Sequence, residues 1–297
     1  MHASTLRISV ILVSSPNRGE DSVWETLASF PQSSTVPREV IVVDVAAPER
    51  EARYRREFPW VTLLGTSERV TIPEGRNLAV AVSRGEVLAF VDDHIRFLRD
   101  YLEVLLDAFA KGADVVGGSV ANANSGTSGS WAHYFAEYSK WLAGIPKPDT
   151  ADLPGSNWAM RRSLYDELGG FEAGAFGLES ELLRRLAAAG RRIVHEPALV
   201  IGHVYERNIV EFWPISFRYG LAYGSSLRLP RWKHLLRAMA FPLIAATLLA
   251  RSYEKAAQTA EYRRKFWKVS LQLTATFAVR AMGEACGSLR RALADRS

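Results

Sequence analysis

The segment FVDDHIRF places two acidic residues and a histidine directly after a run of apolar residues. Asp92 and His94 are two positions apart, so on extended backbone their side chains would point to the same side. Acidic groups at the end of a buried strand cost stability unless a cation or another ligand compensates for them. Carboxylate with imidazole suits Mn²⁺ or Mg²⁺, and imidazole also admits Zn²⁺. The residues alone leave two interpretations open, a divalent metal site and an exposed acidic turn.

Three other polar residues stand beside predicted secondary structure. Asp44 ends the apolar run REVIVVD, where a carboxylate can accept a hydrogen bond from a base or ribose, or can cap a loop. Arg76 opens a predicted helix, where it can balance the acidic segment, contact a diphosphate or stay solvated. His203 follows the apolar run of VIGHV, where a histidine is either structural or a metal ligand.

Strand-like and helix-like segments alternate through the first part of the chain. Buried strands are predicted at residues 7–14, 38–44, 61–65, 86–93 and 113–120, and helices at 22–30, 49–58, 75–84 and 100–111. This alternation predicts an α/β fold with a mostly parallel sheet covered by helices. Ligands bind beyond the carboxyl ends of such strands, so Asp44 and the segment 92–94 are expected at that edge.

The later segments predict more helix than strand. A Gly/Ser-rich loop at 122–130 precedes a helix with an aromatic face at 131–144. Residues 156–171 predict a short strand and a helix that ends at paired glycines. A helix at 179–190 and a closing pair of strands at 191–204 follow, and the remaining pattern is helical to residue 297.

Four blocks, in order and with matching spacing, resemble glycosyltransferase family 2. They are REVIVVD, EGRNLAVAVSRGEVLAFVDDH, GSNWAMRRSLYDELGGFE and FGLESELLRRLAAAG, and the resemblance covers roughly residues 6–205. It implies the GT-A fold, a Rossmann-like mostly parallel sheet flanked by helices. It also implies an inverting enzyme that takes a sugar from a nucleotide-diphosphate sugar.

The resemblance implies a role for each residue of the donor site. Asp44 matches the residue that holds the nucleobase, usually uracil, which favours a UDP-sugar, and Arg76 matches an arginine near the nucleotide. Asp92 matches the first acid of the DxD motif, toward the ribose and the metal, and His94 matches its metal-ligating last residue. The resulting DxH motif resembles that of certain metal-dependent animal GalNAc-transferases, with Mn²⁺ or Mg²⁺ as cofactor. Asp93, in the middle, contacts substrate or has no role.

The general base of the family is an aspartate. It is the second residue of a Glu-Asp pair that precedes a helix. The aligned residues here are Leu178 and Glu179, so Glu179 is the predicted base. Glu181 is the alternative carboxylate for the base or a sugar contact. It also matches an exposed acid in a first helical turn, where the helix dipole favours it.

The resemblance also places residues around the two sugars. It puts a histidine near the metal in the region of His203. Asn157 and Trp158 match positions that line the acceptor and donor sugar pocket. Trp158 can stack on a sugar face or belong to the core.

The charge distribution divides the chain into a catalytic domain and an extension. Residues 228–297 carry 14 Lys and Arg against 4 Asp and Glu, whereas the rest carries 23 against 28. We predict a catalytic domain at 1–205, with a nucleotide-sugar part at about 6–120 and an acceptor part at 121–205. Residues 206–297 form a basic helical extension. Its two basic-then-apolar segments predict a peripheral membrane contact, packing on the catalytic domain, or a homodimer interface.

The remaining features restrict location and competing functions. Cys286 is the single cysteine, which fits a reducing compartment, and residues 238–250 are too short to span a bilayer. No secretory signal is predicted, so the expected location is cytoplasmic, with the inner membrane face as a peripheral site. A sugar nucleotidyltransferase would need a Gly-rich loop that SSPNRGE matches poorly, and no nucleic-acid-binding module is recognised. A degenerate, non-catalytic nucleotide-binding scaffold stays open because of Leu178 and His94, and the acceptor is unassigned.

Overall fold

The computed structural model describes residues 6–14, 21–36, 38–146, 152–172, 178–205 and 207–294, with only the backbone described at 178–181 and at 184. Close contacts divide the chain into two compact units. The first, called the sheet unit, comprises Met1–Ala121 and Ala143–His203. The second, called the helical unit, comprises Asn122–Leu142 and Val204–Ser297.

The predicted strands, together with one that was not predicted, form a single eight-stranded sheet. Its strands lie in the order β3-β2-β1-β4-β7-β6-β8-β5. The first four are mutually parallel, whereas β7 is antiparallel to β4, β6 to β7 and β5 to β8. The bounds are β1 (Ile8–Val13), β2 (Arg38–Val45), β3 (Val61–Thr66), β4 (Val87–Val91), β5 (Ile95–Phe97), β6 (Val115–Asn122), β7 (Asn157–Arg161) and β8 (Ile193–His203).

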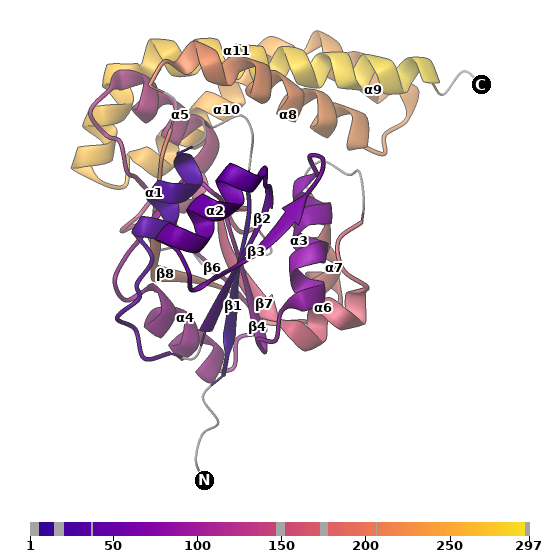
Figure 1. Cartoon of the computed structure of the whole chain (residues 1–297). Coiled ribbons are helices and arrows are strands. Elements are labelled where there is room, and N and C mark those ends of the chain that lie inside the picture. The colour runs from indigo at the N-terminus through magenta and orange to yellow at the C-terminus, as the bar shows by residue number, and fades with distance from the viewer. Residues whose placement is uncertain are drawn as a thin grey trace. The chain divides into compact units, whose positions relative to one another are not determined.

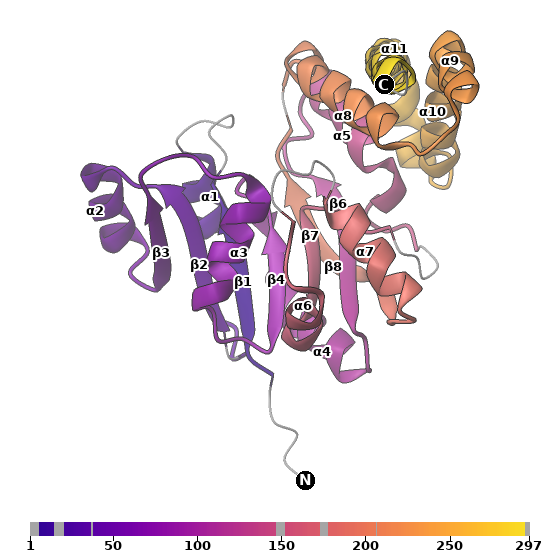
Figure 2. The same ribbon diagram turned by 90° about the vertical axis from the view of Figure 1, so that its right-hand side faces the viewer.

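Helices cover both faces of this sheet, as the sequence predicts. Figure 1 shows α3, α6 and α7 on one face and α1 and α4 on the other, and Figure 2 shows the sheet from a second side. Local sequence sets the helix ends: Thr71 and Glu74 form a capping box before α3, and Gly169 ends α6 with a φ of +75°. The bounds are α1 (Ser22–Ala28), α2 (Pro48–Glu57), α3 (Ile72–Val82), α4 (Tyr101–Ala110), α6 (Arg162–Leu168) and α7 (Leu178–Ala188).

Two details of the sheet differ from the sequence prediction. The predicted pair of strands at 191–204 is wrong, because β8 is one continuous strand. Its buried residues Ile193 and His195, and then Leu199 and Ile201, alternate with more exposed ones, which is the two-residue period of a single strand. The three-residue strand β5 was not predicted, and it pairs with the end of β8.

The helical unit contains the predicted C-terminal helices together with an earlier segment. Its elements are α5 (Ser128–Tyr138), the 3₁₀ helices η2 (Ser139–Trp141) and η3 (Ile209–Phe212), α8 (Trp213–Ser226), α9 (Arg231–Met239), α10 (Phe241–Ala256) and α11 (Ala260–Ala294). Helices α8 and α11 run side by side in both views (Figures 1 and 2). A Cβ atom at Gly220 would lie 2.0 Å from the Arg280 carbonyl oxygen, so this close contact between the two helices requires glycine.

The aromatic helix α5 groups with the C-terminal helices. The sequence-based boundary at residue 205 lies two residues beyond the end of the sheet unit. Residues 122–142, which we expected within the acceptor part at 121–205, belong instead to the helical unit. The ring of Phe135 lies 6.2 Å from that of Tyr262 and 5.5 Å from that of Phe266, which explains the grouping. The functional division into a nucleotide part and an acceptor part stays a prediction.

Candidate functional site

Three side chains lie together at the edge of the sheet where β4 and β8 end. Asp92 and His94 follow β4, and His203 is the last residue of β8. Each offers one ligand atom, and these atoms all lie within 4.8 Å of one another. Nε2 of His203 is 3.7 Å from Oδ2 of Asp92, and the His94 and His203 ring centroids are 4.4 Å apart. The structure thus brings together the three residues predicted as metal ligands.

The backbone that carries Asp92 and His94 is a turn, not the extended segment that the sequence suggested. Two other features fix this turn. The β5–β8 pairing sets His203 opposite Ile95. The buried Thr26 hydroxyl of α1 lies 2.9 Å from the Asp93 carbonyl oxygen and accepts the Ile95 amide at 3.0 Å. Sequence reasoning missed Thr26, and its place beside the apolar residues Trp24 and Leu27 of α1 is the signal that could have found it.

Asp93 orients the imidazole of His94. Oδ1 of Asp93 is 2.8 Å from Nδ1 of His94, and the Asp93 side chain is buried. When Nδ1–H donates to this carboxylate, the lone pair of Nε2 points away from it, as in many metal-bound histidines. Nε2 of His94 is buried and has no hydrogen-bond partner in the described part of the chain. This arrangement favours an orienting role for Asp93 over the sugar contact suggested by the sequence.

The charges around Asp92 favour its ionised form. Burial acts to raise the pKa of this carboxyl group, but the nearby imidazoles of His203 and His94 and the guanidinium of Arg76 outweigh it. The pKa of Asp92 therefore lies below its usual value. An ionised carboxylate beside two imidazoles is a donor set that Mn²⁺ accepts. Together with the unpartnered His94 nitrogen, it shows that the residues fit a divalent cation.

Arg76 is held rigidly near this cluster. Its buried guanidinium donates from Nη2 to the Gly155 carbonyl oxygen at 3.0 Å and lies 5.4 and 5.7 Å from the rings of Phe90 and Phe171. Its charge helps to keep Asp92 ionised. Of the alternatives that the sequence left open for Arg76, the solvated surface position does not agree with this burial.

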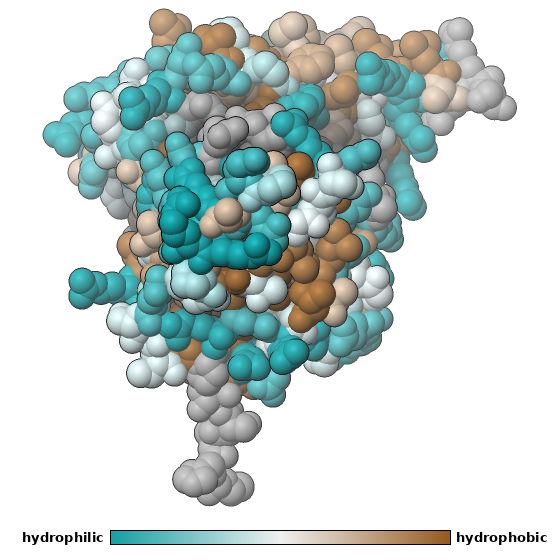
Figure 3. Space-filling view, viewed as in Figure 1, coloured by the Kyte–Doolittle hydropathy of each residue, from teal (hydrophilic) through white to brown (hydrophobic). Residues whose placement is uncertain are grey.

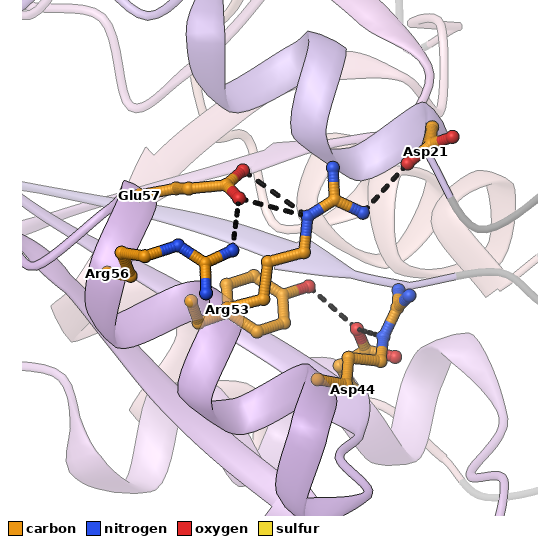
Figure 4. A network of polar contacts seen from close by, with 7 residues as sticks. Asp21, Asp44, Arg53, Arg56 and Glu57 are labelled. Atoms are coloured by element: carbon orange, nitrogen blue, oxygen red, sulfur yellow. Dashed lines mark hydrogen bonds and ion pairs between the residues drawn. The ribbon is translucent and has the colours of Figure 1, made fainter.

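The second acidic residue, Asp44, has partners from its own chain. Its nearly buried carboxylate accepts hydrogen bonds at Oδ2 from Nε of Arg50 (2.7 Å) and from the hydroxyl of Tyr54 (2.6 Å), both on α2 (Figure 4). Trp24 supports both partners, because its ring lies 4.5 Å from that of Tyr54 and 4.6 Å from the Arg50 guanidinium. Sequence reasoning found Asp44 but missed this set of Arg50, Tyr54 and Trp24.

The exposed side of α2 carries a chain of ion pairs near Asp44. Nη1 of Arg53 is 2.9 Å from Oδ1 of Asp21, and its Nε is 3.2 Å from Oε1 of Glu57 (Figure 4). Arg56 reaches the same Glu57 oxygen at 2.8 Å. Such solvent-exposed ion pairs contribute little to stability, so this chain of contacts is only weak evidence for a functional site.

Asn157 and Trp158 lie inside the sheet unit and not at a surface where a sugar could bind. Both side chains are fully buried. Trp158 packs against Phe90 with ring centroids 4.8 Å apart, which is the core position that the sequence left open. Asn157 donates from Nδ2 to the carbonyl oxygens of Ser119 (3.0 Å) and Leu199 (2.9 Å), and so links β6 to β8.

The predicted base lies on α7. Glu179 and Glu181 belong to the first turn of this helix, which begins at Leu178. Their side chains lie outside the described part of the chain, so the distance from these carboxylates to Asp92, His94 and His203 is not defined. The assignment of the base to Glu179, with Glu181 as the alternative, stays a prediction.

Comparisons of the sequence identify a family and several relatives. The family model described as glycosyl transferase family 2 matches residues 10–169, more than half of the chain. Human polypeptide N-acetylgalactosaminyltransferase 10 is 23% identical over 237 residues, which cover 70% of this chain and 39% of that protein. The chain therefore spans about two fifths of that relative's length. The glucosyl-dolichyl phosphate glucuronosyltransferase of Haloferax volcanii is 22% identical over 239 residues, 72% of this chain and 74% of that enzyme.

Solved structures show the same fold. The mannosyltransferase PcManGT from Pyrobaculum calidifontis, in complex with GDP-Man and Mn²⁺, superposes with a TM-score of 0.61 at 18% identity, covering 99% of this chain and 89% of that one. The structure of GalNAc-T7 with UDP, GalNAc and Mn²⁺ gives a TM-score of 0.54 at 17% identity, covering 77% and 52%. These likenesses confirm the GT-A fold predicted from the sequence.

Proposed function

The chain belongs to glycosyl transferase family 2, and we propose from this that it transfers a sugar from a nucleotide-diphosphate sugar to an acceptor hydroxyl in a metal-dependent reaction. The observation that carries the proposal is the cluster of Asp92, His94 and His203 at the carboxyl-end edge of the sheet. This edge is where open α/β sheets bind their ligands. Membership of the family supplies the reaction class, and the cluster supplies a place for the metal.

Asp92, His94 and His203 are the residues that would hold the ion. Asp93 keeps the lone pair of His94 Nε2 available, and Arg76 adds positive charge next to Asp92. When bound, a divalent ion stabilises the negative charge that develops on the leaving nucleotide. Both neighbouring structures contain Mn²⁺, which makes Mn²⁺ the first candidate and Mg²⁺ the alternative.

The donor that we propose is a UDP-sugar. Asp44 supports it through its place at the end of β2, where the family holds the nucleobase. The buried contacts from Arg50 and Tyr54 set the position of that carboxylate. The neighbouring structures contain different nucleotides, GDP-Man in one and UDP in the other, so binding must be compared for both bases.

Glu179 is the proposed general base. Its carboxylate takes the proton of the acceptor hydroxyl while that oxygen forms a bond to the anomeric carbon. The bond from this carbon to the nucleotide breaks on the opposite face, so the configuration inverts. Glu179→Gln should lower transfer by about 100-fold or more, the range of general-base catalysis, with donor affinity unchanged. Glu181→Gln is the comparison variant, because loss of transfer in it alone would assign the base to Glu181. Near-normal turnover of Glu179→Gln would refute the assignment.

The acceptor is a proposal at the level of chemical class only. The two relatives are named for different acceptors, a polypeptide in the human protein and glucosyl-dolichyl phosphate in the archaeal one. We propose a hydroxyl group on one of these two classes of carrier. Transfer from radiolabelled UDP-sugars onto peptides and onto lipid-linked sugars would distinguish them.

Calorimetric titration tests the donor part of the proposal. UDP and GDP are titrated into the protein with and without Mn²⁺, and then with Mg²⁺. We expect one nucleotide, UDP, to bind with an affinity that depends on the metal. If folded protein binds neither nucleotide in the presence of metal, the chain is a degenerate scaffold or uses another donor.

A further inference from the structure

The corner between α9 and α10 exposes large apolar side chains. Met239 and Leu243, on the two sides of the corner, are 70% and 71% exposed, and Trp232 and Leu236 on α9 are also exposed. Residues 241–250 are all apolar apart from Pro242 and Thr247, and none of them is buried. Figure 3 shows hydrophobic residues over the C-terminal helices, interrupted by hydrophilic ones. Large exposed apolar side chains gathered in one region in this way mark a protein or membrane contact.

The other sides of these helices are occupied by protein. On α9, His234 and Ala238 are buried, and Arg237 pairs with Glu284 of α11. On α10, only Ser252 and Ala256 are buried, near its C-terminal end, and Ser252 donates to the Phe135 carbonyl oxygen at 3.1 Å. The helical unit therefore holds one side of α9 and one end of α10, and the corner between them projects from that packing.

Basic residues border the apolar corner. The sequence from Arg228 to Tyr253 contains no Asp or Glu, and Arg231 and Lys233 flank Trp232 on α9. At a bilayer interface, Trp lies at the level of the headgroups, and Lys and Arg extend toward the lipid phosphates. The corner thus combines positive charge with apolar side chains, and anionic lipid surfaces attract this combination.

A similar surface continues on α11. The ring of Trp267 on α11 lies 5.3 Å from the ring of Tyr253 near the end of α10. Leu271, one turn further along α11, is 83% exposed. Arg264 and Lys268 are spaced to lie on the same side of α11 as these two residues. The mixture of aromatic, aliphatic and basic groups therefore extends beyond the corner itself.

The geometry favours a position in the interface over a crossing of the bilayer. Within the described ranges, no helix by itself has both the length and the apolar composition of a membrane span. Helices α9 and α10 pass that test only as a pair, and they are bent by 71°. A bent amphipathic pair suits the headgroup region, where the corner reaches the acyl chains and the basic residues stay at the surface.

We propose that the α9–α10 corner docks the protein on an anionic lipid bilayer. The alternative, a second copy of the chain, fits less well because a two-fold interface repeats the same patch on both subunits. The basic residues around Trp232 would then face one another without acidic partners from this segment. The proposal does not depend on the sugar chemistry of the sheet unit, so either can fail without the other.

Vesicle flotation of the full chain tests the proposal. We expect the protein to float with phosphatidylglycerol–phosphatidylcholine vesicles, to float poorly with pure phosphatidylcholine, and to be released by high salt. Leu243→Glu should lower the partition coefficient by about tenfold or more, because it removes apolar contact and adds repulsion. Leu236→Glu should act in the same direction.

Leu78→Glu is the matched control, since Leu78 is 44% exposed on α3 of the sheet unit and the variant has the same net charge. We expect it to float like the wild-type protein. The proposal is overturned if the folded wild-type chain does not float with the anionic vesicles, or if Leu243→Glu and Leu78→Glu behave alike. It is also overturned if light scattering shows a dimer that Leu243→Glu dissociates while the wild-type protein binds no vesicles.

Discussion

Two clusters of polar side chains, one around Asp92 and one around Asp44, lie at the ends of parallel strands in the sheet unit. Their carboxylates have different partners. After β4, Asp92 stands beside two histidines, and Nε2 of His94 is buried without a partner among the described residues. At the end of β2, the carboxylate of Asp44 accepts hydrogen bonds from Arg50 and Tyr54 at 2.7 and 2.6 Å. In the described part of the chain, the first cluster keeps a nitrogen free for a ligand, whereas the carboxylate of the second already has two donors from the protein.

This difference predicts opposite consequences of mutation. A buried polar atom without a partner lowers the stability of the ligand-free protein. Removing such an atom therefore costs little stability, and its main effect is the loss of ligand binding. A buried carboxylate with two donors stabilises the fold, so removing a donor lowers the free energy of unfolding. Metal affinity and stability should therefore separate between the two clusters.

The largest effect is expected for His94→Ala. This variant loses the nitrogen that has no partner among the described residues, and Mn²⁺-dependent nucleotide binding should fall by more than the roughly 10–100-fold typical of outer-shell partners. Calorimetric titration measures the affinity, and thermal unfolding without metal checks that the variant, which also loses the Nδ1 contact to Asp93, is folded. Full retention of Mn²⁺-dependent binding would remove His94 from the metal site.

A smaller loss is expected for Asp93→Asn. The amide oxygen can still accept a hydrogen bond from Nδ1 of His94, but it has no charge to hold the imidazole in that tautomer. Mn²⁺ affinity should fall by about tenfold, at the lower end of the range for outer-shell partners. If Asp93→Asn binds Mn²⁺ like the wild-type protein, the orienting role is wrong.

Substitutions in the Asp44 cluster should lower the stability of the protein. Tyr54→Phe removes a buried hydrogen bond to a charged carboxylate, which contributes about 1.5–3 kcal/mol to the free energy of unfolding. Denaturant unfolding should show this loss, while Mn²⁺ affinity stays unchanged. A variant with wild-type stability and weakened Mn²⁺ binding would reverse the comparison.

The smallest effect is expected on the exposed side of α2. Glu57 accepts from Arg53 and Arg56, but all three side chains face solvent (Figure 4). Screening by water and salt leaves such pairs with little net energy. Glu57→Gln should leave the melting temperature within experimental error. A clear decrease would show that these ion pairs act cooperatively with the neighbouring Asp44 cluster.

The sequence predicted the sheet because most of its strands are short runs rich in apolar residues, and the metal ligands follow two of these runs. It did not predict Thr26, since its contacts with the turn at 93–95 depend on how α1 packs. Nor could it decide between core and sugar pocket for Trp158, because an aromatic after a loop suits both. The grouping of α5 with the C-terminal helices depends on contacts between aromatic residues far apart in the chain.

We propose that Asp92, His94 and His203 bind a divalent cation together with a nucleotide. Electron paramagnetic resonance tests it directly, because free Mn²⁺ gives a signal that is lost on binding. The wild-type chain should bind a single Mn²⁺ more tightly when UDP or GDP is present, and His94→Ala should leave the free signal nearly unchanged. An undiminished signal with the folded wild-type protein and either nucleotide, or equal binding by the variant, would contradict the claim.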